Sequence, residues 1–183
     1  MNKIVIIIIG LLIYSCHIPQ SSNTRGGRML NKVEREVFRV FEEKEIELEH
    51  VDSQFPNLQI FKINYENGDP MGFAVLTLAQ GCMVNGCIVE RDKLNGEFEE
   101  FTFLTIYNLS GVIEHIRILD YNSEYGYEIA SVAWLRQFFH KPGVKFTLGD
   151  NIDAISGATV TVKSLISTVN TQQIILDSLV GEQ

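Results

Sequence analysis

The chain has 183 residues, of which 45% are hydrophobic and 21% charged, and its formal net charge is −8. This length is sufficient for one domain with its own core. The acidic balance argues against nucleic acid as a partner, because binding to a phosphate backbone needs clustered Lys and Arg. The same balance disfavours adhesion of the whole chain to anionic lipid.

The N-terminus has the layout of a secretory signal peptide, with a short positively charged start followed by an apolar run over residues 4–13. This run is too short for a comfortable membrane span, which takes about 20 residues. The string Leu12-Ile13-Tyr14-Ser15-Cys16 resembles the cleavage site of a bacterial lipoprotein. The resemblance implies removal of residues 1–15 and lipidation of the Cys16 thiol. An uncleaved anchor or an ordinary secreted protein are the alternatives, and each places the remaining chain outside the cytoplasm.

Cleavage before Cys16 removes one basic residue, Lys3, and no acidic one, so the formal net charge changes from −8 to −9. The lipid at Cys16 then holds the protein on the periplasmic side of the envelope or at the cell surface. Residues 16–28 form the lipidated cysteine and a polar tether that cannot build a core. Residues 29–183 are expected to form a single domain.

An amphipathic helix is predicted from Met29 to about Lys44, with Val33, Val37 and Phe41 on its apolar face. Residues 42–49 that follow are dense in acid. This acidic segment fits either a solvated helix end or a docking patch for an electron-transfer partner.

Strand character appears in five later segments, separated by turn signals such as Asn67-Gly68 and Ser110-Gly111. These strands are 58–65, 72–78, 88–90, 98–107 and 112–119. Two hairpins are expected, one formed by 58–65 with 72–78 and the other by 98–107 with 112–119. Helices are expected at 128–139, with Trp134 in the core, and at 160–179. The order predicts an α+β domain with a largely antiparallel sheet and flanking helices, not a βαβ repeat.

Two cysteines, Cys82 and Cys87, flank the strong turn pair Asn85-Gly86. This turn allows the chain to fold back and bring the two thiols within bonding reach, and an oxidising compartment favours a disulfide between them. Two thiolates are too few for a structural zinc site, and the four histidines lack ligand spacing.

The turn before the last helix carries the chemistry of the chain. Residues 153–161, Asp-Ala-Ile-Ser-Gly-Ala-Thr-Val-Thr, lead through small side chains into a helix start. The unpaired N–H groups and the positive dipole end of such a helix favour an anion such as phosphate, and Gly157 and Ala158 let it approach the backbone. The turn alone also fits a well-capped helix without a ligand.

The longer string Asp-x-x-Ser-Gly-Ala-Thr-x-Thr resembles the FMN-binding domain family, which includes flavin-carrying subunits of the sodium-translocating NADH:quinone oxidoreductase and of the related ferredoxin:NAD oxidoreductase. The resemblance covers roughly residues 72–180. Within this range, segments 111–119 and 135–141 also resemble the family. It implies FMN joined covalently, as a phosphoester, to the hydroxyl of Thr159. The other residues implied in holding the cofactor at this turn are Asp153, Ser156, Gly157, Ala158 and Thr161.

A second family feature is the loop at 123–127, which takes the place of a Glu-Thr-Pro-Gly-Leu loop and matches it only at Glu124, with Gly126 one position early. Its position implies Glu124 and Tyr125, with Tyr127, as neighbours of the flavin ring. The resemblance further implies a separate flavin transferase that moves FMN from FAD with the help of a metal ion. Asp153 then serves recognition by the transferase, caps a local turn, or does both.

These features predict a membrane-anchored, extracytoplasmic flavoprotein that passes electrons between a membrane donor and an extracytoplasmic acceptor, with redox proteins at the membrane as partners. Cys82 and Cys87 are then either a loop staple, two unreactive thiols or a redox-active pair that exchanges electrons with the flavin. Whether the chain is an electron carrier or an oxidoreductase component stays open. The alternatives are an FMN-dependent reductase of a small molecule, a lipoprotein binding module that is never modified, and an accessory part of an ion-pumping complex.

Overall fold

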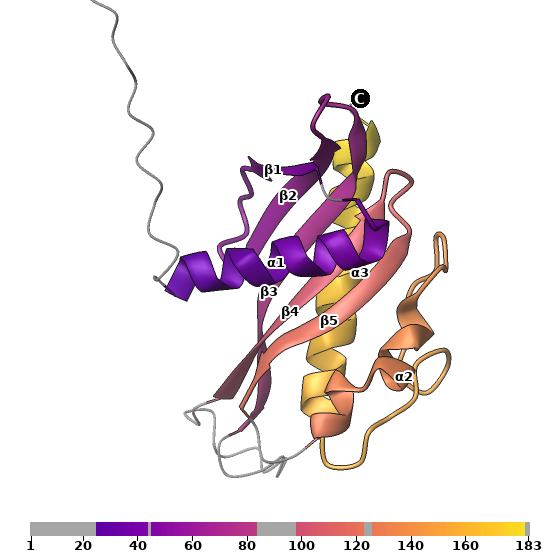
Figure 1. Cartoon of the computed structure of the whole chain (residues 1–183). Coiled ribbons are helices and arrows are strands. Elements are labelled where there is room, and N and C mark those ends of the chain that lie inside the picture. Colours follow the sequence, from indigo (N-terminus) through magenta and orange to yellow (C-terminus); the bar gives the residue numbers. More distant parts are fainter. Residues whose placement is uncertain (1–24, 44, 84–97, 123–125, 182–183) are drawn as a thin grey trace, which may run out of the picture.

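The structure is a computed structural model, and it describes residues 25–43, 45–83, 98–122 and 126–181 (Figure 1). Helix α1 (Arg25–Phe41) comes first. Five strands follow: β1 (Ile46–Val51), β2 (Leu58–Tyr65), β3 (Pro70–Met83), β4 (Phe98–Asn108) and β5 (Ile113–Tyr121). The short helical turns η1 (Tyr127–Ala130), α2 (Val132–Leu135) and η2 (Arg136–Phe138) precede the long helix α3 (Thr159–Gly181).

The five strands form one sheet in the order β1-β2-β3-β4-β5, and each pairs with its sequence neighbour in antiparallel fashion. The prediction of an α+β domain with an antiparallel sheet and flanking helices is therefore confirmed, as are the two hairpins. The strand expected at 88–90 lies outside the described residues. β1 is an addition, because the acidic segment expected to be a helix end instead alternates Ile46 and Leu48 with glutamates along a strand.

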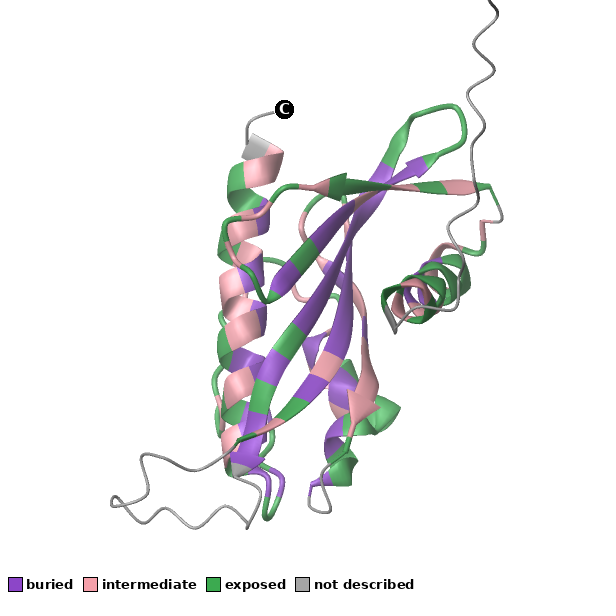
Figure 2. Ribbon diagram, turned by 90° about the vertical axis from the view of Figure 1, so that its left-hand side faces the viewer, coloured by how far each residue is buried: buried purple, intermediate pink, exposed green. Residues whose placement is uncertain are grey.

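The sheet is covered by a helix on each face, α1 on one and α3 on the other (Figures 1 and 2). Alternate residues of β3 therefore enter two different cores. Phe73 and Val75 belong to the core under α3, whereas Ala74 and Leu76 belong to the core under α1. Burial on both faces explains why β3 is apolar along most of its length, unlike a strand with one solvated face.

A buried polar network links α3 to the sheet. The hydroxyl of Tyr107 donates to Gln172 Oε1 at 2.7 Å, and Gln172 Nε2 donates to Thr77 Oγ1 at 2.7 Å. Burial raises the pKa of Tyr107 well above its ordinary value. The phenol therefore stays protonated and remains a donor, which fixes the rotation of α3 over the sheet.

Two helices differ from the sequence expectation. α1 begins at Arg25, so residues 25–28, expected in the tether, are helical, and it ends at Phe41 because Glu42 takes a left-handed conformation with φ 55°. The helix expected at 128–139 is instead broken into η1, α2 and η2, since Ser131 is extended with φ −67° and ψ 123°. Within the described residues, no helix has the length and hydropathy that a membrane crossing requires.

Candidate flavin attachment site

The motif turn forms the N-terminus of α3, which begins at Thr159. The first helical hydrogen bond runs from the N–H of Val162 to the carbonyl of Ala158 at 2.9 Å. The N–H groups at the start of the helix therefore have no partner within it, and the first turn of α3 holds no acidic residue. Fixed positive partial charge is thus concentrated at the turn, as an anion site needs.

The outer side of the turn is open. Asp153, Ser156, Gly157 and Thr159 are all exposed. Gly157 has φ +76°, and a Cβ added to it would meet nothing within 4 Å. The residues present therefore fit a phosphate group, because free space lies over the backbone beside the exposed hydroxyl of Thr159.

The inner side of the turn is packed against Gly126. Ala158 is fully buried, and a Cβ built on Gly126 would lie 2.2 Å from the Cβ of Ala158. Gly126 also has φ +70°, a conformation that favours glycine. The structure thus brings Gly126 to the motif turn, whereas Glu124 and Tyr125 lie outside the described residues. Tyr127, just beyond Gly126, is 70% exposed.

The end of β3 also contacts the motif. The hydroxyl of Thr161 donates to Cys82 Sγ at 3.4 Å, and the same sulfur lies 3.7 Å from the carbonyl oxygen of Gly157. Thr161 and Cys82 are both buried, so Thr161 contributes its side chain to packing and can offer an anion only its backbone. Cys82 is disulfide-bonded. Cys16 and Cys87 lie outside the described residues, and the Cys82–Cys87 pairing stays a prediction.

Two side chains before the motif hold the backbone of Asp153. Gln137 Oε1 accepts from the Asp153 N–H at 2.8 Å, and Trp134 Nε1 donates to the Asp153 carbonyl at 3.0 Å. Gln137 Nε2 in turn donates to the Trp134 carbonyl at 3.0 Å. The carboxylate of Asp153 is left exposed while its main chain is fixed. Trp134, expected in the core, is half-buried, and its indole N–H serves the site.

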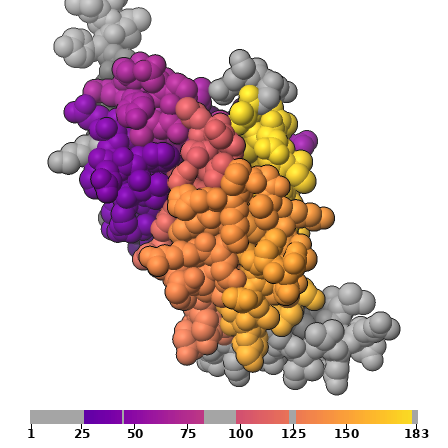
Figure 3. All heavy atoms as spheres, turned by 90° about the vertical axis from the view of Figure 1, so that its right-hand side faces the viewer, coloured from indigo at the N-terminus to yellow at the C-terminus, as the bar shows by residue number. Residues whose placement is uncertain are grey.

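The segment that carries these contacts, residues 126–158, covers one side of the molecule between β5 and α3 (Figure 3). Three separate parts of the chain therefore meet the turn: the end of β3, the residue Gly126 and the pair formed by Trp134 and Gln137. Sequence spacing did not reveal the last two contacts, because they join positions 16 to 32 residues apart within irregular structure. Among the described side chains, no group of three or more His, Cys, Asp or Glu residues is placed to hold a metal ion.

Comparison with known proteins bears on the same part of the chain. No curated protein matches the sequence. Residues 100–172 match the family model described as the FMN-binding domain. This range runs from β4 into α3 and contains the motif turn, Gly126, Trp134 and Gln137. The match supports the resemblance to the FMN-binding domain family and FMN as the cofactor of this part of the chain.

Proposed function

We propose that the protein is an exported, membrane-anchored flavoprotein that carries FMN covalently on Thr159. In this proposal it transfers electrons between a donor at the membrane and an acceptor outside the cytoplasm. The anchor is the lipid on Cys16, and the cofactor is attached by a flavin transferase.

The observation that carries the proposal is the position of Thr159. It is the first residue of α3, it is exposed, and it stands two residues after Gly157, over which the structure leaves open space. A phosphate esterified to its hydroxyl would lie against the unpaired N–H groups of the helix start, where the dipole favours negative charge. The family match over residues 100–172 includes this position.

The proposed attachment reaction transfers the phosphoryl group of FMN from FAD to the hydroxyl of Thr159. An O–P bond forms between Thr159 Oγ1 and the FMN phosphorus of FAD, the pyrophosphate bond breaks, and AMP leaves. A threonine hydroxyl is a poor nucleophile without a base, so the proposal gives the base and the metal ion to the transferase. The fixed main chain and exposed carboxylate of Asp153 give that enzyme a rigid feature to recognise.

Bound FMN supplies one- and two-electron chemistry, and the protein contributes orientation and charge around the ring. Because the attachment turn is at the surface, the cofactor is held where redox partners can approach. The covalent link prevents loss of the cofactor by dilution outside the cell.

The test is to express the chain with and without a flavin transferase, denature it, and record its intact mass and in-gel flavin fluorescence. We expect a mass gain of FMN less one water, which Thr159→Ala abolishes. Ser167→Ala is the matched control, because it removes an exposed hydroxyl of α3 outside the motif turn. The control variant is expected to be modified like the parent chain.

An unmodified chain in the presence of an active transferase would contradict the covalent proposal and favour a binding module. Modification that persists in Thr159→Ala would place the ester elsewhere. If the loaded protein is reoxidised by a small molecule faster than by any protein acceptor, the reductase alternative replaces the electron carrier.

A further inference from the structure

The charge of the chain is unevenly distributed. In a chain of net charge −8, helix α1 carries two acidic residues, Glu34 and Glu36, and five basic residues. Four of the basic residues recur at helical spacing along one side of α1, next to an arginine of β5. We call this set the basic stripe: Arg28, Lys32, Arg35, Arg39 and Arg117.

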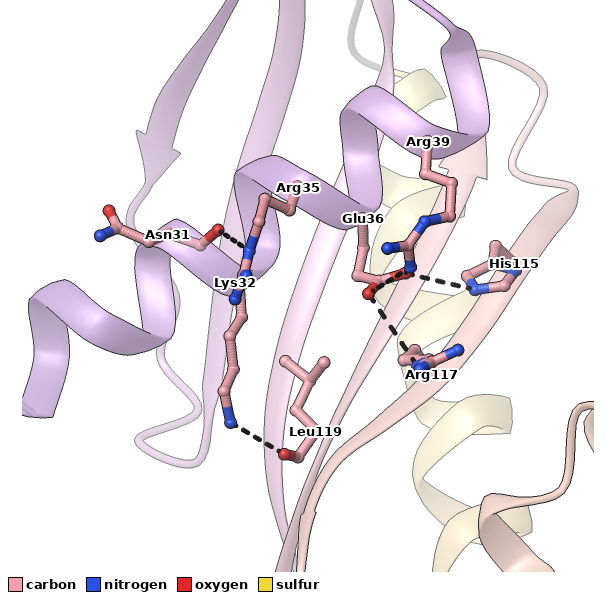
Figure 4. Close-up of polar contacts among 8 residues, drawn as sticks. All are labelled: Asn31, Lys32, Arg35, Glu36, Arg39, His115, Arg117 and Leu119. Carbon is pink, nitrogen blue, oxygen red and sulfur yellow. Dashed lines mark hydrogen bonds and ion pairs between the residues drawn. The ribbon is translucent and has the colours of Figure 1, made fainter.

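Three members of the stripe, Lys32, Arg39 and Arg117, meet at the junction between α1 and β5, where the buried Glu36 lies close to both arginines (Figure 4). Arg39 Nη1 donates to both carboxylate oxygens of Glu36, at 2.7 and 2.6 Å, and Arg117 Nε lies 3.9 Å from the same group. The Glu36 side chain is only 10% exposed, whereas those of Arg39 and Arg117 are 60% and 43% exposed. Lys32 Nζ donates to the Leu119 carbonyl at 3.0 Å. The charges that this side of α1 presents to solvent are therefore mostly positive, with the exposed Glu34 beside Arg35.

Helix stability does not account for the charges at the start of α1. Arg25 and Arg28 occupy its first turn, which holds no acidic residue. Positive charge at a helix N-terminus opposes the dipole, so these positions weaken the isolated helix. Binding of these basic residues to a partner outside the fold would explain their presence at the start of α1.

The place of α1 in the chain indicates what that partner is. Arg25 follows Cys16 by nine residues, a span of at most about 32 Å when fully extended. A protein held at the membrane through residue 16 therefore keeps α1 closer to the lipid than most of the domain. Leu30 and Phe38 are also exposed on this helix, by 37% and 42%. Both side chains lie toward β1 and β2, away from Arg39 and Arg117, so the charges of α1 and its place in the chain are what favour a membrane surface.

We infer that the basic stripe rests on an anionic phospholipid surface, such as one containing phosphatidylglycerol, and orients the domain on the membrane. The inference depends on the proposed function only in taking the N-terminus to hold the chain at the membrane. The net negative charge of the chain does not prevent this binding, because salt screens charges that are more than a Debye length apart. The charges that face the membrane, and not the net charge, therefore determine the attraction.

The test uses the mature chain without its lipid (Cys16→Ser) and without FMN, so that neither the anchor nor the cofactor contributes. Co-sedimentation with phosphatidylcholine vesicles is compared with co-sedimentation on vesicles that also contain phosphatidylglycerol. We expect binding only to the anionic vesicles, falling as salt is raised. The variant Arg28→Gln/Arg35→Gln removes two exposed charges of the stripe. At about fivefold per charge, its binding should fall roughly 25-fold.

The matched control is Lys145→Gln/Lys163→Gln, which removes two exposed lysines outside the stripe and changes net charge equally. It should bind vesicles like the parent chain, and thermal unfolding should show both variants folded. Equal binding to neutral and anionic vesicles would overturn the inference, and so would equal losses in the two variants. Retention of the parent chain by an acidic protein but by no vesicle would assign the stripe to a protein partner instead. Failure of FMN attachment to Thr159 would leave all these results unchanged.

Discussion

Substitution of Gly126 by alanine tests the packing of the attachment site. The new Cβ would lie 2.2 Å from the Cβ of Ala158 and 3.3 Å from its Cα. Carbon atoms pack best at about 3.5–4.0 Å, so the turn has to move by more than an ångström. Such overpacking costs about 1–3 kcal/mol. The left-handed backbone at φ +70° adds about 1–2 kcal/mol for a residue with a Cβ. We expect a total loss of about 2–5 kcal/mol in the free energy of unfolding.

Gly143→Ala separates the two contributions. Gly143 has φ +64°, and a Cβ there would meet nothing within 4 Å, so this variant carries the backbone cost alone. Urea unfolding of both variants, followed by circular dichroism, gives the difference due to the close approach, about 1–3 kcal/mol. Ala158→Gly removes the clashing Cβ and should restore part of the stability lost in Gly126→Ala. If Gly126→Ala loses no more stability than Gly143→Ala, Gly126 does not pack on Ala158 as described.

Three further predictions concern single side chains. Burial lowers the pKa of His115 in the folded protein, although Glu36 opposes this. In the unfolded chain the imidazole has its ordinary pKa of about 6.5, so the unfolded chain binds more protons than the folded one near and below that pH. The free energy of unfolding, measured with urea, should therefore fall as pH drops from about 7.5 to 5.5. In His115→Gln it should depend less on pH over this range. Gln172→Leu leaves the buried Tyr107 hydroxyl without its acceptor and should cost about 1–3 kcal/mol, measured in the same way; an unchanged stability would show that the network adds nothing. Gln137→Ala removes the acceptor of the Asp153 N–H, which should cost about 1 kcal/mol and reduce FMN attachment per unit time in the mass assay. Attachment at the parent rate would show that this hydrogen bond does not matter to the transferase.

Local patterns predicted most of the sheet, because its strands pair with their sequence neighbours. The strand at 58–65 coincides with β2, and the predicted hairpin partners differ from β3, β4 and β5 mainly in length. β1 was missed because its glutamates read as a solvated surface, although Ile46 and Leu48 alternate with them along one face. The broken helix at 127–138 was missed because its apolar spacing fits one continuous helix equally well.

The motif predicts which residue is the candidate for attachment, but it does not predict the tertiary contacts of the turn. The contacts of Cys82 with Gly157 and Thr161 join residues 75 and 79 positions apart, which no local pattern encodes. The roles of Trp134 and Gln137 also depend on tertiary structure, since an apolar aromatic and a glutamine within a helical pattern carry no sign of a distant backbone partner.

The meander and the attachment turn differ in when they can form during folding. Hairpins between sequence neighbours close over short loops and need no other part of the chain. The turn at Thr159 is complete only when β3, Gly126 and the Trp134–Gln137 pair have all been positioned, and α3 is the last element of the chain. A protein exported through its N-terminus delivers α3 last. On the proposed function, flavin attachment at Thr159 would follow translocation, and a chain that lacks one of the three supports would form its sheet without becoming fit for modification. Attached flavin would therefore report that the C-terminal half has docked, which makes its fluorescence a marker of correct maturation in the envelope.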